Sequence, residues 1–411
     1  MTRHISSIMG QQVLSEPPAP CICDECLGDA LLKTIAVGLD PRSRCAACDA
    51  PAIRGLQLQR IAKLLETVLP AHFVVGCIYD KYELYLEDII ARAIGCESLQ
   101  ACDAIAKLLV EPDASDEDFF FDGQEYSRES SPFESQEHEE SWIVDRWDSI
   151  ARDLTHGRRF FNEPVREFFQ SLIDEALQAK GADSNAGSPV VRTLPPGTSL
   201  FRARITADTR DLERFQADPL NALGAAPRER ARNNRMSAAG VPLLYTSRDI
   251  ETCIAEVRPS IGDTVVVGRF ITTATLKIFD FYALTVHLQH APLSLFDPNY
   301  QERVQQRLLL QYLHREIARP VKASETDYVV TQALAEFIAH ETEKAFDGLA
   351  FRSVQRNEGE NIVLFIKGDQ VEYRYGRGGP LFQVEISPSD VSTHKIGGVT
   401  YHLEGEGDSS R

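Results

Sequence analysis

The sequence lacks any long apolar run. No stretch approaches the roughly 18 consecutive apolar residues that a helix needs to cross a bilayer. The first residues, MTRHISSIMGQQVLSEPP, also lack an apolar core of the length found in signal peptides. We therefore expect a cytoplasmic protein that does not enter the membrane.

Basic residues are scarce relative to acidic ones. Lysine and arginine total 43 against 61 aspartates and glutamates, and the formal net charge is -18. Such an excess of negative charge argues against broad binding to nucleic acid or to an anionic membrane, although a local basic site can survive within it. With 411 residues, of which 43% are hydrophobic, the chain is long enough for two or three globular domains.

Cysteines are few, but four of them are paired at short spacing. Nine cysteines are an odd number, which does not suit a disulfide framework. Cys23, Cys26, Cys45 and Cys48 follow the pattern C-x2-C-x18-C-x2-C, which predicts one structural zinc ion held tetrahedrally by four thiolates. Such a closed site would do no chemistry. A dithiol redox role or unliganded thiols are the alternatives, with Cys21 as a neighbour that could substitute for a ligand.

Composition divides the chain into three expected domains. We predict a zinc-binding ribbon over residues 1–52 and an all-α region over 53–180, where apolar residues recur three and four apart. The segment KGADSNAGSP is rich in Gly, Ser and Asn and marks a domain boundary. Within the helical region, residues 111–140 contain twelve acidic residues and one basic residue, Arg128, which predicts a long mobile loop with the three phenylalanines 119–121 as a docking point.

After residue 190 the pattern changes to short strands with intervening helices, so we predict an α+β domain over residues 190–405. The strand-like segments are SLFRARI, PLLYTS, DTVVVGRFITT, TLKIFDF, DGLAFRSV, NIVLFIKG and VEYRYG. The helical segments are PNYQERVQQRLLLQYLHREIA and DYVVTQALAEFIAHETEKAF.

One glutamate in this domain stands out because it borders an apolar stripe. In the helical pattern of DIETCIAEVRP, the stripe is formed by Ile250, Cys253, Ile254 and Val257, and Glu256 lies at its margin. Taken alone, the helix suggests an ordinary surface glutamate.

Other polar residues recur at the ends of strand-like segments, where an α+β fold usually collects its site. They are Arg202 in LFRAR, Arg235 in RMSAAG, Tyr245 in LLYTS and Ser353 in AFRSV. The ordered set LFRAR, RMSAAGVPLLYTS, ETCIAEVRP, YVVTQALAEFI, FDGLAFRSV and GENIVLF closely resembles the RES domain, a family named after an Arg, a Glu and a Ser, over roughly residues 190 to 370. The cysteine pairs and the later RRFFN segment resemble the zinc-containing HEPN/RES N-terminal region.

The resemblance implies a fold similar to ADP-ribosyltransferases and the consumption of NAD⁺, as in RES toxins of toxin–antitoxin pairs. Carried over by position, the catalytic residues are Glu256, Arg202 and Tyr245. Breaking the nicotinamide–ribose bond builds positive charge on the sugar, which the carboxylate of Glu256 would stabilise. Arg202 would bind the pyrophosphate, and Tyr245 would offer its ring to nicotinamide.

The same resemblance assigns substrate binding to Arg235 and Ser353, with Arg204 as a competitor for the role of Arg202. Arg235 would bind the pyrophosphate, and Ser353 would bind a sugar hydroxyl or fix the wall of the cleft. One departure concerns the stretch NRMSAAG, because the family often has Gly-Arg followed by an aromatic residue and prolines. The contact of this loop with the dinucleotide is therefore open.

We therefore predict an NAD-degrading, toxin-like enzyme that works by hydrolysis or phosphorolysis in toxin–antitoxin or anti-phage defence. One alternative is transfer of ADP-ribose to a protein or nucleic acid. An alternative of another class is an inactive, zinc-containing regulatory protein. An antitoxin or other inhibitory partner fits the prediction, and the sequence leaves the acceptor, the oligomeric state and the role of the N-terminal region open.

Overall fold

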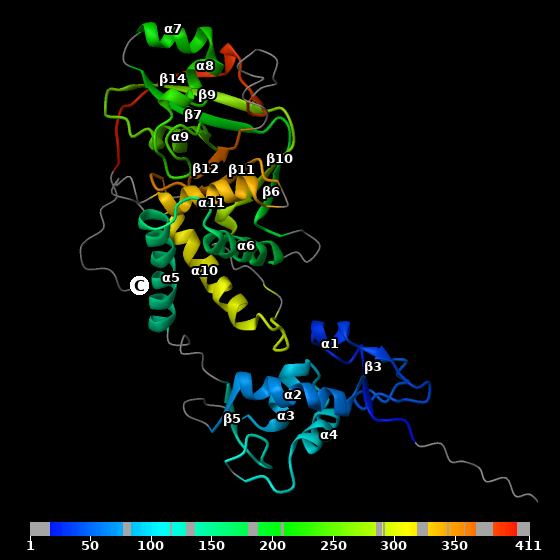
Figure 1. Cartoon of the computed structure of the whole chain (residues 1–411). Helices are drawn as coiled ribbons and strands as arrows, with labels where there is room; N and C mark the ends of the chain where they lie inside the picture. The colour runs from blue at the N-terminus through cyan, green and yellow to red at the C-terminus, as the bar shows by residue number, and fades with distance from the viewer. Residues whose placement is uncertain are drawn as a thin grey trace, which may run out of the picture. The chain divides into compact units, whose positions relative to one another are not determined.

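The computed structural model describes residues 17–76, 84–115, 117–128, 136–179, 188–206, 209–284, 290, 292–318, 328–342, 345–356, 358–366 and 381–400. The chain forms two compact units (Figure 1). Unit 1 comprises Met1–Gln136 and Pro292–Gln301, and unit 2 comprises Glu137–Ala291 and Glu302–Arg411. The mixture of helices and strands confirms the predicted α+β class. Within the described ranges, no helix has the length and apolar character that crossing a membrane requires.

Unit 1 contains a small sheet and a helical layer that share one hydrophobic core. The antiparallel sheet has the order β1-β3-β2, with β1 at Cys21–Cys23, β2 at Val37–Gly38 and β3 at Arg54–Gln57. The helices are α1 (Ala30–Thr34), α2 (Leu58–His72), α3 (Leu86–Ile94) and α4 (Leu99–Leu109). The all-α region was predicted to begin at residue 53, but Arg54–Gln57 form β3 and the first long helix begins at Leu58.

A contact between two glycine backbones joins the cysteine-bearing segment to the helices. Helix α3 ends at Gly95, which adopts a φ of 65°, and the backbone N–H of Gly28 donates to the carbonyl of Ile94 at 3.0 Å. A Cβ atom on Gly28 would lie 2.3 Å from the carbonyl oxygen of Gly95. Neither position has room for a side chain, and the cysteine-bearing segment shares a single packed core with helices α2, α3 and α4.

The acidic stretch differs from the predicted mobile loop in the part that the structure describes. Strand β5 (Tyr126–Arg128) pairs with β4 (Phe73–Val75). Tyr126 is only 1% exposed, its hydroxyl donates to the carbonyl of Phe119, and Phe119 and Phe120 pack against the core of unit 1. These aromatic contacts hold the described part of the segment in place despite its acidic composition. Residues 129–135 lie outside the described ranges, and a helix begins at residue 136.

Unit 2 has a helical layer that covers one face of a large sheet. The helices are α5 (Gln136–His156), α6 (Glu163–Gln178), α10 (Tyr300–Ala318) and α11 (Val329–His340). Trp147 of α5 and Leu172 of α6 belong to the same buried cluster as Leu313 of α10 and Phe337 of α11. The sequence grouped α5 and α6 with the preceding helices, whereas their apolar faces pack in unit 2.

Within the described ranges, the sheet of unit 2 has nine strands in the order β13-β9-β7-β8-β12-β11-β10-β6, with β14 also paired to β9. The strands are β6 (Val191–Leu194), β7 (Ser199–Thr206), β8 (Leu244–Ser247), β9 (Thr264–Thr272), β10 (Leu276–Asp280), β11 (Gly348–Arg352), β12 (Glu360–Leu364), β13 (Val384–Glu385) and β14 (Val391–Lys395). Only the β10–β11 pair is parallel among the pairings described. Six predicted strand segments are confirmed, and the seventh, VEYRYG, lies outside the described residues.

Side-chain alternation gives each face of the sheet its own core. In β12, Val363 joins the cluster that contains the helical layer, whereas Ile362 and Leu364 join a second cluster with Phe215 and Leu223. Those two belong to helices α7 (Thr209–Ala217) and α8 (Pro219–Leu223). A third, smaller cluster packs α9 (Ile250–Glu256) against β7 and β9 (Figure 1). The short 3-10 helices are η1 (Arg228–Arg230), η2 (Phe281–Leu284) and η3 (Pro388–Asp390).

Candidate metal centre and active-site cavity

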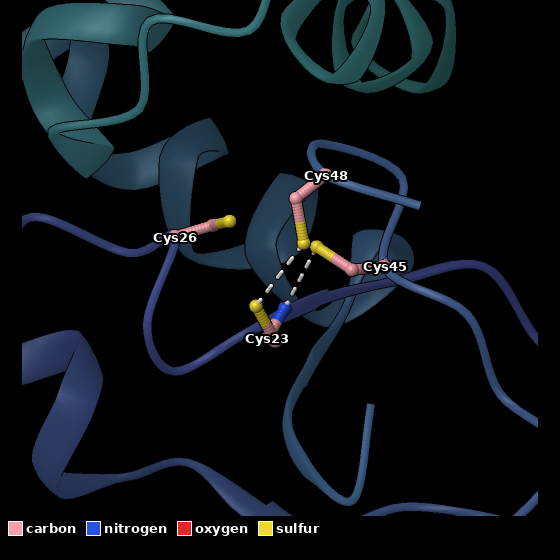
Figure 2. Close-up of side chains that lie close together, drawn as sticks. All are labelled: Cys23, Cys26, Cys45 and Cys48. Carbon is pink, nitrogen blue, oxygen red and sulfur yellow. Dashed lines mark hydrogen bonds between the residues drawn. The ribbon is translucent and has the colours of Figure 1, made fainter. Parts of the chain in front are cut away.

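The four paired cysteines come together in unit 1. The sulfur atoms of Cys23, Cys26, Cys45 and Cys48 all lie within 4.8 Å of one another, and Figure 2 shows the four side chains converging from two segments of the chain. The sulfurs of Cys23 and Cys48 are 3.9 Å apart. Tetrahedral ligation of zinc with bonds of about 2.3 Å separates the sulfurs by about 3.8 Å. The group can therefore hold a metal ion.

Main-chain N–H groups support this cluster. The sulfur of Cys45 accepts hydrogen bonds from the N–H groups of Cys23 at 3.2 Å and Ala47 at 3.4 Å. Burial alone would raise the pKa of Cys45, but these donors and that of Cys48 outweigh it and lower the pKa to about 7. Cys21 is not part of the cluster, and its thiol donates to the carbonyl of Arg44 at 3.4 Å.

A cavity of about 540 Å³ in unit 2 brings together most of the residues predicted for the active site. Arg202, Arg235, Tyr245 and Glu256 all line it. Ser353 is 5% exposed and binds the carboxylate of Glu256. The remaining predicted residue, Arg204, lines a different pocket of unit 2.

The cavity lies where two neighbouring strands diverge. Strands β7 and β8 pair only at Phe201 and Ser247, whereas β7 pairs with β9 along its whole length. Across the divergence, Nη1 of Arg202 donates to the main-chain carbonyl of Tyr245 at 3.2 Å. Burial, together with the charge of nearby Arg204, lowers the pKa of the Arg202 guanidinium to about 10. Arg202 is thus still a cation at neutral pH.

Helix α9 places Glu256 at the cavity. Asp249 caps the helix by accepting from the N–H of Thr252 at 2.7 Å, and the apolar stripe around Cys253 packs on β7 and β9. Glu256, in the last turn, is exposed. Its Oε1 accepts from the hydroxyl of Ser353 at 2.6 Å and from Nδ2 of Asn361 at 2.7 Å. Both donors are buried, so the carboxylate is fixed from the protein side.

Asn361 is a residue that the sequence did not single out. Its Oδ1 accepts from the hydroxyl of Ser247 at 2.7 Å, which orients the amide so that Nδ2 faces Glu256. Ser353 is oriented in turn by the N–H groups of Gln355 and Arg356, which donate to its hydroxyl oxygen at 3.1 and 3.2 Å. The only sequence signal for Asn361 was a polar residue at the start of the apolar run NIVLF.

Helix α11 forms hydrogen bonds with the main chain of the loop that carries Arg235. Nε2 of Gln332 donates to the main-chain carbonyl of Asn234 at 2.7 Å, and the hydroxyl of Thr331 donates to the carbonyl of Arg235 at 2.6 Å. The guanidinium of Arg235 lies 5.6 Å from the centre of the Tyr328 ring, within the range of a cation–π contact. The stretch that departs from the family pattern is thus held by main-chain contacts.

Tyr245 lines the cavity beside this loop. Its hydroxyl accepts from the main-chain N–H of Met236 at 3.2 Å and forms a hydrogen bond of 3.2 Å with the hydroxyl of Ser237. Burial raises the pKa of Tyr245 and outweighs the lowering effects of these two contacts and of Arg202. The side chain is therefore a neutral, positioned phenol at physiological pH.

Comparison with known proteins gives one family match. Residues 199–379 match the family model of the RES domain. This family is generally associated with NAD-related toxin function. No curated protein and no solved structure shows significant similarity to the chain. In the N-terminal part, the cysteine cluster is the observation that suggests a zinc-containing region.

Proposed function

We propose that this chain, whose residues 199–379 belong to the RES domain family, cleaves the nicotinamide–ribose bond of NAD⁺. The observation that carries the proposal is the exposed carboxylate of Glu256, fixed by two buried donors in a cavity that is also lined by Arg202 and Arg235. We place the nicotinamide and its ribose beside Glu256. Water or phosphate would then attack the ribose and accept the ADP-ribose group.

The geometry of Glu256 suits the charge that develops in this reaction. Ser353 and Asn361 both donate to Oε1, and Oε2 has no hydrogen-bond partner among the described residues. As the bond to nicotinamide breaks, the ribose becomes an oxocarbenium-like cation. A carboxylate oxygen already held in place stabilises that cation without reorganising during the reaction. Glu256 is the catalytic residue in this proposal.

Arg202 and Arg235, two of the three arginines that line the cavity, bind the dinucleotide. Arg202 and Arg235 come from different elements and both face the cavity, so their forked donors can bind phosphate oxygens from two sides. Tyr245 offers a ring face to nicotinamide. Ser353 already donates to Glu256, so its first role in this proposal is to position that carboxylate.

The cysteine cluster holds a structural zinc ion in the same proposal. Four thiolates satisfy the tetrahedral preference of zinc and leave no open position for a substrate. The metal would stabilise unit 1, and the chemistry would belong to unit 2. A toxin of this kind requires control, so we include an inhibitory partner protein in the proposal.

The decisive test is the Glu256→Gln variant incubated with NAD⁺. The change keeps the shape and removes the charge, so we expect folding and NAD⁺ binding to survive while turnover falls by about 10² or more. Nicotinamide release measured by mass spectrometry checks the rate. Turnover equal to that of the unmodified protein would refute the role of Glu256.

An experiment with labelled NAD⁺ identifies which group accepts the ADP-ribose. With the adenylate half labelled, free ADP-ribose indicates hydrolysis and ADP-ribose 1-phosphate indicates phosphorolysis. Label attached to a macromolecule would instead show transfer. Arg202→Ala is the companion variant, and we expect it to weaken NAD⁺ binding together with the rate, because phosphate contacts exist in the ground state and in the transition state.

A further inference from the structure

A second pocket of unit 2, next to the cavity, is rich in arginine. Its volume is about 800 Å³, and it lies between β7, α7, α8 and η1. We call it the arginine pocket. Its charged lining consists of Arg204, Arg214, Arg230, Arg232, Asp218 and Glu229.

The basic side chains of the arginine pocket are only partly neutralised. Arg214 forms an ion pair of 3.2 Å with Asp211, and Asp218 is engaged as the cap of α8. Neither Arg230 nor Arg232 forms an ion pair with any residue that the structure describes. Four arginines against two acids is an unusual balance for a chain whose net charge is -18. The pocket therefore carries an excess of positive charge that could attract an anion.

Arg204 is the inner member of this group. Its Nη2 donates to the main-chain carbonyl of Gly224 at 3.2 Å, while its Nε is buried without a hydrogen-bond partner. Burial lowers the pKa of Arg204, and the charges of Arg214 and Arg230 lower it further. A buried N–H donor without a partner costs free energy unless a ligand satisfies it. An anion in the pocket would satisfy Nε and relieve the repulsion among the arginines.

We propose that the arginine pocket binds a phosphate group. Several guanidinium groups around one space match a phosphate, which carries up to two negative charges and accepts forked hydrogen bonds. Arg202 and Arg204 are two residues apart on β7 and therefore lie on one face of the strand. One lines the cavity and the other lines the arginine pocket. The phosphate site thus adjoins the proposed catalytic site.

Two sources of phosphate fit this position. One is the dinucleotide itself, whose phosphates would extend from the cavity toward Arg204; this source rests on the proposed function. The other is a free phosphate ion, and that source does not depend on NAD⁺ cleavage. Both share the chemistry that the arginine pocket recognises, and binding experiments separate them.

The test is the double change Arg230→Gln with Arg232→Gln in the full-length Glu256→Gln protein, which should not turn over NAD⁺. Both arginines are exposed, so the fold should survive, and thermal melting checks this. Calorimetric titrations with inorganic phosphate and with ADP-ribose measure the affinity. We expect a loss of about tenfold or more for at least one probe, since charged hydrogen bonds are removed.

Arg228→Gln is the matched control. Arg228 belongs to the same short helix η1 and is exposed, but it lines an adjoining apolar pocket instead of the arginine pocket. This variant loses one positive charge from the same surface, so it reports any general electrostatic effect. We expect both affinities to stay within about twofold of the parent, because long-range effects between exposed charges are screened.

The pattern of losses identifies the source. The pocket is assigned to the dinucleotide if the double change weakens ADP-ribose binding and if, made in the protein that keeps Glu256, it raises the KM for NAD⁺ and leaves cleavage of nicotinamide riboside unchanged. Weaker binding of inorganic phosphate alone assigns it to a free ion. The proposal is overturned if neither probe binds the parent, or if both bind the double variant as tightly as the parent. If the unmodified protein does not cleave NAD⁺, the proposed function fails, but the phosphate titration still decides the pocket.

Discussion

The cysteine cluster and the cavity are built from the chain in opposite ways. The four cysteines lie between residues 23 and 48, whereas the cavity draws on residues from Phe201 to Asn361. The first site needs only two short segments of chain, one with Cys23 and Cys26 and one with Cys45 and Cys48. The second needs the strand order that puts β8 between β7 and β12. A local site can therefore be recognised from spacing, and a dispersed site from the order of its segments.

The two sites should also respond differently to mutation. In a zinc site each ligand contributes to one bound ion, so the loss of one thiolate endangers the whole centre. In the cavity the support is divided among separate hydrogen bonds, such as those of Ser353 and Asn361 to Glu256. The loss of one of these hydrogen bonds should therefore lower the activity only partly. Four variants test this contrast.

Cys45→Ser should have the largest effect. Structural zinc contributes about 10–16 kcal/mol of apparent binding free energy in small domains, which is comparable with the whole stability of a domain, about 5–15 kcal/mol. We expect loss of zinc, measured by metal analysis, and rapid proteolysis within unit 1. Cys21→Ser is the control, since Cys21 is buried but outside the cluster, and it should retain the metal. Unmodified protein purified without chelator and free of zinc would contradict the proposal.

Asn361→Ala should reduce turnover without unfolding the protein. The change removes one of two hydrogen bonds to a charged oxygen of Glu256, an interaction of about 1.5–3 kcal/mol, which corresponds to about 10- to 150-fold in rate. We expect kcat to fall more than KM changes. Asn361→Asp would place a second carboxylate beside Glu256, so activity on acidification should be lost at a higher pH than in the unmodified protein. An unchanged pH profile would argue that Asn361 is merely structural.

Gly359→Ala should strain the supports of Glu256. A Cβ atom at this position would lie 2.7 Å from the hydroxyl oxygen of Thr252 and 3.0 Å from Cβ of Ser353. Overpacking of this kind costs about 1–3 kcal/mol, and we expect a lower melting temperature and slower turnover. Gly397→Ala is the control, because a Cβ there meets no atom within 4 Å. Equal stability of the two variants would show that the Gly359 turn can relax.

Arg356→Ala should have the smallest effect. Its guanidinium pairs with Asp249 at 2.5 Å, but both side chains are more than a third exposed. Exposed ion pairs contribute about 0–1 kcal/mol, so we expect a shift in unfolding free energy below about 1 kcal/mol that shrinks with added salt. Asp249→Ala should cost more, because it also removes the cap of α9. A larger effect for Arg356 would mean that the pair contributes more than its exposure suggests.

The sequence predicted elements better than it predicted their assembly. Apolar alternation located six strands of the sheet, and the helical stripe at Cys253 correctly left Glu256 at its border. Side-chain networks could not be predicted, because Asn361 reaches Glu256 only through the pairing of β8 with β12. The separation of Arg204 from Arg202 depends on helices α7 and α8, which the apolar pattern did not indicate.

The grouping of helices shows the same limit. Helices α5 and α6 lie before the Gly- and Ser-rich boundary, yet their apolar residues are buried with α10 and α11. Periodicity shows that a helix has an apolar face, but it does not say which partner covers that face. In the acidic stretch, charge composition predicted a loop, whereas the buried ring of Tyr126 and the pairing of β5 order the described part.

The single pairing between β7 and β8 has a consequence for the dynamics of unit 2. Two strands joined at one residue pair protect few amide protons across their shared boundary, as the free border of a sheet does. We therefore expect the backbone amides at the boundary between β7 and β8, next to the cavity, to exchange rapidly with deuterium. The amides of β9 and β11 should exchange slowly. A ligand that contacts both β7 and β8 would slow the exchange at the boundary between them. The exchange rate at this boundary would then report whether the cavity is occupied.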